Sequence, residues 1–164
     1  MKDKSLTVFK KDKANKKIYI QHNFSASLNI VWSAFTESEI LDRWWAPKPW
    51  IAQTEKMEFS EGGYWLYVMI GPKGDKHWGR TDYKTITPQK DFTALDAFCN
   101  SNGELIQDLP QNHWKTSFSE ESNSTIVNFE LTFNTLDDLE RLIEMGMKEG
   151  FIAALDNLDC ILEE

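Results

Sequence analysis

Residues 135–164 constrain the fold of this chain more than any other segment. At 100° per residue they predict one long amphipathic helix that begins after Thr135, a residue suited to the N-cap position. Its apolar stripe comprises Leu136, Leu139, Ile143, Gly146, Met147, Gly150, Ala154, Leu158 and Ile161. Because such a helix must bury its stripe, the rest of the chain has to supply a large apolar surface.

Two glycines, Gly146 and Gly150, lie one turn apart on this stripe. Glycine costs a helix interior about 1 kcal/mol relative to alanine, so the pair predicts either close approach of a neighbour or open space. With Ile143 and Met147 they leave the middle of the stripe small and soft, which favours one wall of a ligand cavity. The alternative is that aromatic side chains fill the gap completely.

The chain before this helix reads mostly as strands. Residues 125–133 alternate cleanly, with Val127, Phe129 and Leu131 on one face, as in an antiparallel sheet with one buried side. The same reading predicts strands over residues 6–9, 17–24, 50–59, 64–70, 76–87, 91–99 and 114–119, and two short helices over residues 27–35 and 36–46. The order indicates an α+β fold in which a curved antiparallel sheet surrounds the long C-terminal helix.

Length and charge limit the function classes. At 164 residues the chain is expected to form one domain, and its seven tryptophans and ten phenylalanines suffice for a core. Residues 1–17 carry seven lysines against two aspartates, so that of the net charge of −8 the remaining residues carry −13. An acidic body argues against nucleic-acid binding. The lysine-rich residues 1–16 form either a solvated arm or an edge hairpin.

No motif for chemistry stands out. There is neither a membrane-length apolar run nor a signal peptide, and Cys99 and Cys160 match no metal or disulfide spacing, which is typical of a cytoplasmic protein. The three histidines are scattered singly, each expected at the surface or in a loop. No cofactor, metal or catalytic residue is therefore predicted. Among the strand carboxylates Glu58, Asp82 and Asp96, one could face the interior as a general acid or base, although Asp82 beside Arg80 is more typical of a solvated face.

Four short signatures follow one another along the chain: Val31-Trp32 with Phe35-Thr36-Glu37; Trp44-Trp45-Ala46-Pro47; Glu61-Gly62-Gly63-Tyr64-Trp65 with Gly71-Pro72-Lys73-Gly74; and Gly150-Phe151 with Leu155-Asp156-Asn157-Leu158. In this order they resemble the activator-of-Hsp90-ATPase-like branch of the START/Bet v 1-like superfamily, whose fold is the helix grip. The resemblance spans roughly residues 17–162. Ala46, Ser60 and Phe151 depart from the glycine, arginine and tryptophan that the family usually has there.

The resemblance implies a deep cavity between the sheet and the long helix, and two short helices after the first strand of the core. It implies that Trp65, Tyr67 and Met69 line this cavity, that Leu66 and Ile70 face outward, and that Trp44 and Trp45 lie near its mouth. Strand alternation adds Trp114, Phe118 and Phe129 as lining candidates, opposite Ile143, Gly146, Met147 and Gly150 of the helix.

Three functions remain open. The first is a monomeric or homodimeric cytoplasmic module that binds a small apolar or aromatic molecule. The second, which the superfamily also contains, is a cyclase-like or hydratase-like enzyme, which needs at least two polar side chains converging in the cavity. The third, suggested only by the resemblance, is a cofactor of an Hsp90-type chaperone.

Overall fold

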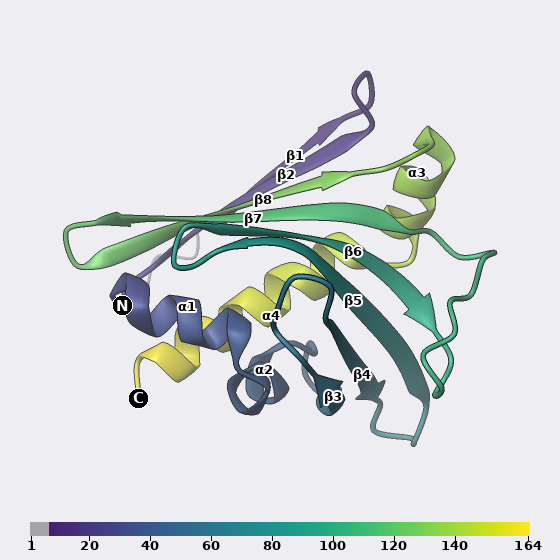
Figure 1. Cartoon of the computed structure of the whole chain (residues 1–164), viewed down its shortest axis with the longest axis horizontal. Helices are drawn as coiled ribbons and strands as arrows, with labels where there is room; N and C mark the ends of the chain where they lie inside the picture. The colour runs from purple at the N-terminus through teal and green to yellow at the C-terminus, as the bar shows by residue number, and fades with distance from the viewer. Residues whose placement is uncertain (1–6) are drawn as a thin grey trace.

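The computed structural model describes residues 7–164 and contains one antiparallel sheet of eight strands (Figure 1). The strands follow the order β1-β2-β8-β7-β6-β5-β4-β3 across the sheet. Their bounds are β1 Thr7–Asp12, β2 Lys17–Phe24, β3 Ile51–Met57, β4 Tyr64–Ile70, β5 Lys76–Thr87, β6 Asp91–Cys99, β7 Asn112–Glu121 and β8 Ser124–Thr132. β1 and β2 form a hairpin at one edge, which places the described part of the lysine-rich segment in the sheet.

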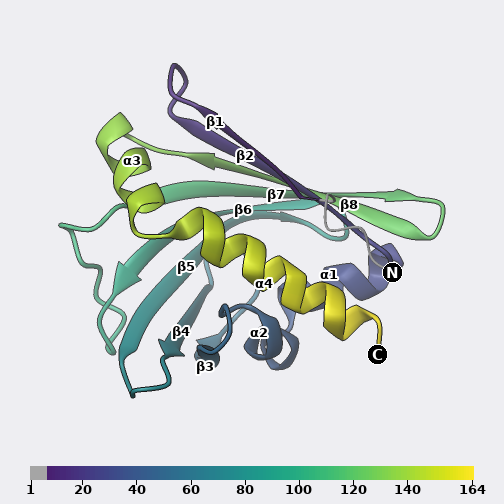
Figure 2. The ribbon, with the colours of Figure 1, turned by 180° about the vertical axis from the view of Figure 1, so that it is seen from behind.

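Four helices lie against one face of this sheet or at its end. They are α1 Leu28–Thr36, α2 Ser38–Trp44, α3 Leu136–Glu144 and α4 Met147–Leu162. α4 crosses the concave face of the sheet, with α1 and α2 beside it, and α3 lies at the end of the sheet near the start of α4 (Figure 2). This arrangement confirms the predicted α+β helix-grip fold. Within residues 7–164, no helix is both long enough and apolar enough to cross a membrane.

The core lies between the sheet and α4. Val127, Phe129 and Leu131 of β8 are buried, which confirms the face predicted from their alternation. From the helix side, Phe151, Ala154, Leu155 and Leu158 are buried at the i, i+3, i+4 and i+7 spacing of one helix face. Leu66 lies on the outer face of β4 as expected, yet it is buried beside the loop that contains Gly103.

The prediction of one continuous helix over residues 135–164 is wrong. The N-cap at Thr135 is confirmed, because its hydroxyl accepts a hydrogen bond from the Asp138 N–H at 3.1 Å. α3 ends at Glu144, however, and α4 starts only after Gly146, whose φ of +92° lies in the left-handed region. A left-handed residue ends a helix, and glycine adopts this conformation at little cost. Gly146 therefore changes the chain direction between two helices.

Replacing Gly146 by alanine is expected to lower the free energy of unfolding by about 1 kcal/mol, because an L-residue is strained in the left-handed region. No described atom lies within 4 Å of the position of an added Cβ, so this loss would come from the backbone and not from a clash. Urea unfolding of Gly146→Ala and Gly146→Asn measures this loss of stability, and the smaller loss is expected for asparagine. An alanine variant as stable as the wild type would contradict the left-handed assignment.

Gly150 and Asn157 attach α4 to the segment that follows α2. The Asn157 amide nitrogen donates a hydrogen bond to the Ala46 carbonyl at 3.0 Å, so this side chain has a structural partner. A Cβ at Gly150 would lie 3.7 Å from Pro47 Cγ, an ordinary van der Waals contact. The Asn157 amide also lies 3.5 Å from the Trp44 carbonyl, so these contacts hold the chain before and after Trp45.

One histidine is buried, which corrects the prediction that all three lie at the surface or in loops. His22 of β2 is 1% exposed, and its Nε2 lies 2.9 Å from Oδ2 and 3.0 Å from Oδ1 of Asp159 in α4. Its Nδ1 contacts the Thr7 hydroxyl. This pair joins the sheet to the helix inside the core, whereas His77 and His113 are exposed as predicted.

Candidate functional site

The space between the sheet and α4 is occupied mainly by aromatic rings. Trp45, at the end of α2, lies at the centre, with ring centroids 5.3 Å from Trp65, 6.0 Å from Phe151 and 6.5 Å from Trp114. Trp65 in turn stacks on Tyr67 at 4.2 Å. Trp45 was expected near the mouth of a cavity; its ring packs among these aromatic rings, and the residue stays partly exposed.

Small hollows lie between these rings within residues 7–164, and two of them matter for the site. The first, here called the Trp114 hollow, has a volume of about 40 Å³ and is lined by Phe35, Leu41, Trp45, Trp65, Thr81, Tyr83, Phe92, Ala94, Asp96, Trp114, Thr116 and Phe129. The second, the Asn112 hollow, has about 90 Å³ and is lined by Tyr67, Met69, His77, Trp78, Gly79, Asp96, Ala97, Phe98, Pro110, Asn112 and Leu142. Pockets for drug-sized ligands measure about 300–1,000 Å³. Between the described sheet and α4 there is therefore no deep open cavity, and aromatic side chains occupy most of the gap.

Asp96 borders both hollows. It follows Phe92 and Ala94 at alternate positions of β6, so all three side chains point to the interior. Its Oδ1 accepts a hydrogen bond from the Thr81 hydroxyl on β5 at 2.8 Å. The Asp96 residue is half-buried, and it belongs to the lining of both hollows.

Burial raises the pKa of the Asp96 carboxyl to about 6, because the apolar surroundings disfavour its charged form. The Thr81 hydrogen bond opposes this rise, and the charge of Asp82 adds to it. Burial and then the Asp96 charge also raise the pKa of Tyr67 and Tyr83, so both hydroxyls stay protonated and can donate hydrogen bonds.

Several polar atoms beside Asp96 have no hydrogen-bond partner among the described residues. They are Nε1 of Trp45, Nε1 of Trp114 and Oδ1 of Asn112, all sealed from solvent. The Trp45 N–H lies close enough to the Tyr67 hydroxyl to hold its pKa down slightly, but it does not reach hydrogen-bond geometry. Buried polar atoms usually have partners, so this cluster marks a place where a bound molecule or water could supply them.

Five of the predicted lining residues do border the hollows. Trp65, Trp114 and Phe129 line the Trp114 hollow, and Tyr67 and Met69 line the Asn112 hollow. The three residues of β4 were expected there from the family resemblance, and those of β7 and β8 from strand alternation.

The other predicted residues border neither hollow. Trp44 is fully buried, and its Nε1 donates to the Ala34 carbonyl at 2.9 Å. Phe118 is buried against Trp32 of α1. The remaining four belong to the helices: Ile143 and Met147 pack at the edge of the core, Gly146 separates α3 from α4, and Gly150 faces Pro47.

Sequence reasoning did not assign Asp96, Thr81, Asn112 or Gly79 to the site. Alternation with Phe92 was a usable signal for Asp96, which had only been named as one of three strand carboxylates. Gly79 leaves room for the Tyr67 ring, since a Cβ there would lie 2.6 Å from the Tyr67 hydroxyl. By contrast Asp82 is bound by the Arg80 guanidinium at 2.9 Å, as expected for the outer face.

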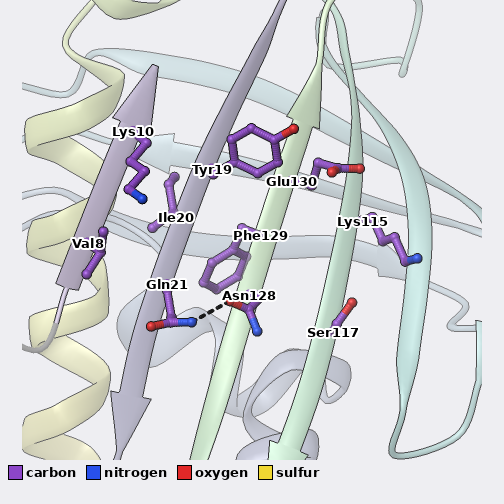
Figure 3. Close-up of a pocket in the computed structure, with 10 residues that line it drawn as sticks. All are labelled: Val8, Lys10, Tyr19, Ile20, Gln21, Lys115, Ser117, Asn128, Phe129 and Glu130. Atoms are coloured by element: carbon purple, nitrogen blue, oxygen red, sulfur yellow. Dashed lines mark hydrogen bonds between the residues drawn. The ribbon is translucent and has the colours of Figure 1, made fainter. Parts of the chain in front are cut away.

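A larger, open groove lies on the opposite face of the sheet (Figure 3). It has a volume of about 610 Å³ and is lined by Val8, Lys10, Tyr19, Ile20, Gln21, Lys115, Ser117, Asn128, Phe129 and Glu130. Gln21 donates a hydrogen bond to Asn128 across its floor at 2.9 Å, and lysines and a glutamate lie along its sides. This outer groove is shallow and mixed in charge. The interior, with its enclosed aromatic lining and few converging polar groups, has the character of a small-molecule site.

Comparison with known proteins agrees with this architecture. The sequence model of a family described as activator of Hsp90 ATPase homolog 1-like protein matches residues 25–163. A solution structure of a protein from Arthrobacter aurescens superposes with a TM-score of 0.91 at 29% identity, covering 96% of this chain and 92% of that one. A crystal structure of a Mycobacterium smegmatis protein superposes with a TM-score of 0.88 at 25% identity, covering 95% of this chain and 96% of that one. No curated protein sequence matches the chain.

Proposed function

Because the chain belongs to the activator of Hsp90 ATPase homolog 1-like family, and so has the helix-grip fold, we propose that it binds a small aromatic molecule between the sheet and α4. The observation that carries this proposal is the Asp96 carboxyl, which borders both hollows and is surrounded by aromatic rings. A buried carboxyl that no packing argument requires destabilises a protein, so its presence favours a role in binding.

The ligand would enter by taking the place of Trp45. The two hollows are too small for an aromatic ring, so a ring has to displace a side chain. Trp45 is partly exposed, lies at the C-terminal end of α2, and leaves its indole N–H unpartnered. Its outward rotation would join the Trp114 hollow to the space of an indole ring, next to Asp96 and the Trp114 N–H.

Thermal unfolding in the presence of one- and two-ring aromatics, including indole, phenol and benzylamine, tests this proposal. A ligand at about 100 times its Kd is expected to raise the Tm by about 5–10 °C, since such saturation stabilises by about 2.7 kcal/mol. Ala94→Leu, which fills the Trp114 hollow beside Asp96, should abolish the shift. Asn128→Ala in the outer groove should leave it unchanged.

Two outcomes would contradict the interior site. One is a shift that survives Ala94→Leu and disappears in Asn128→Ala, which would place the ligand in the outer groove. The other is the absence of a shift with every aromatic tested.

General acid–base catalysis on the bound molecule is a second candidate function. It is favoured by the pKa of Asp96, which lies near 6 with the protonated Tyr83 hydroxyl in the same lining. A carboxyl with a pKa near the working pH exchanges protons efficiently with a bound substrate. An enzyme of this kind would lose turnover in Asp96→Asn while it still binds its substrate. The cytoplasmic location, the monomeric or homodimeric state and the Hsp90-type cofactor role stay predictions.

A further inference from the structure

We propose that the ligand carries a cationic head, such as a primary ammonium, which occupies the Asn112 hollow between Asp96 and Asn112. The inference rests on the proposed function, because it names the class of molecule that the interior site takes. It follows from the arrangement of acceptor oxygens, the charge of the lining and the size of this hollow.

Asp96 and Asn112 are direct cross-strand partners in the ladder between β6 and β7, and both line the Asn112 hollow. Side chains at such positions start from Cβ atoms about 5 Å apart, so one small group can contact both. Asn112 is only 4% exposed, and its Oδ1 accepts no hydrogen bond from residues 7–164. The Thr81 hydroxyl donates to Asp96 Oδ1, and Asp96 Oδ2 accepts no hydrogen bond from residues 7–164. Two free acceptor oxygens side by side call for a group with several N–H donors.

The charge of Asp96 has no counter-ion in the described protein. No lysine or arginine is among the residues that line either hollow, and the nearby Arg80 is bound to Asp82. The one histidine in the lining is His77, which is exposed and makes no hydrogen bond or ion pair with Asp96. A buried carboxylate is normally paired, because removal from water is costly for an isolated charge. A cation bound beside Asp96 would therefore stabilise the ionised carboxylate.

The Asn112 hollow also fits a small head group. Its volume of about 90 Å³ corresponds to about three water molecules, which suits an ammonium and the carbon that carries it. Tyr67 and Phe98 contribute aromatic rings to the same lining, and a ring face presented to a ligand favours cations over neutral groups. Because Asp96 borders both hollows, a head bound here would direct an attached ring toward the Trp114 hollow and Trp45.

Three probes of equal size and different head charge test the proposal at pH 7.5: benzylamine, benzyl alcohol and benzoate, each titrated calorimetrically. Benzylamine, a cation at this pH, is expected to bind at least about tenfold more tightly than benzyl alcohol, and benzoate most weakly. Asp96→Asn should abolish the preference for the amine. Asn112→Leu should weaken amine binding several-fold and leave the alcohol unaffected.

The matched control is Asp82→Asn, which removes the same charge from the outer face. It should keep the amine preference, because a general attraction of cations to this acidic protein would weaken equally in both variants. Equal binding of the amine and the alcohol would contradict the proposal of a cationic head but not the aromatic site. Loss of the amine preference to the same extent in Asp82→Asn would also contradict the cationic head. Failure of all three probes to bind would contradict the proposed function together with this inference.

Discussion

Asp96→Asn is expected to stabilise the protein at pH 7.5 by about 3 kcal/mol. The pKa of this carboxyl is raised from 3.8 to about 6 in the folded state, mainly by burial. A raised carboxyl pKa means that the folded protein holds a proton where the unfolded chain has released it, so wild-type stability falls as the pH rises from about 4 to about 6. Asparagine keeps an acceptor for the Thr81 hydroxyl and carries no charge, which removes this penalty.

The pH dependence isolates the effect of Asp96. Near pH 4 the carboxyl is protonated in the folded state, so the variant and the wild type should be about equally stable. Between about pH 4 and 6 the difference in the free energy of unfolding between variant and wild type should grow, and above about pH 6.5 this difference should stay constant. Urea unfolding of both proteins across this range measures the difference, from which all other titrating groups cancel. A variant that is less stable than the wild type at pH 7.5 would show that the carboxylate is stabilising in place.

His22→Leu is expected to lower the free energy of unfolding by about 1–3 kcal/mol, the range for the loss of a hydrogen bond between buried polar groups. Leucine preserves the apolar contact with the core but removes both ring nitrogens. Nε2 lies 2.9 and 3.0 Å from the two Asp159 carboxylate oxygens, and Nδ1 contacts the Thr7 hydroxyl. The lost interaction also joins β2 to α4, the helix that the sheet grips.

His113→Leu is the matched control for this change. His113 of β7 is exposed and lines neither hollow, so its replacement should alter stability by less than about 0.5 kcal/mol. Urea unfolding of the two variants at pH 7.5 gives the comparison. A loss below about 1 kcal/mol in His22→Leu would mean that the buried pair contributes little.

Alternation predicted the faces of the strands well, because a period of two leaves only one choice once a face is buried. Val127, Phe129 and Leu131 were placed correctly for this reason, and Asp96 could have been placed by the same rule from Phe92. Register between strands is a longer-range property. The pairing of Asp96 with Asn112 therefore required the folded sheet.

Neither the helix break at Gly146 nor the extent to which side chains fill the interior could be predicted from the sequence. A glycine on an apolar stripe is compatible with a packed helix, an open space or a left-handed turn, and only the backbone angle of Gly146 distinguishes them. The position of Trp45 depends on where α2 ends relative to α4, which the Asn157 hydrogen bond to Ala46 helps to set. Because these contacts join distant segments, local pattern could predict an aromatic interior but not how much of it stays empty.

The titration of the Asp96 carboxyl carbon, followed by NMR in selectively ¹³C-labelled protein, tests the central claim most directly. A midpoint near pH 6 is predicted for the free protein, because the carboxyl lies in an enclosed aromatic interior. Saturation with an aromatic amine that binds should move this midpoint to lower pH, since a bound cation favours the ionised form. A midpoint near 4 that does not respond to such a ligand would contradict both the enclosure of Asp96 and its role as the polar anchor of the site.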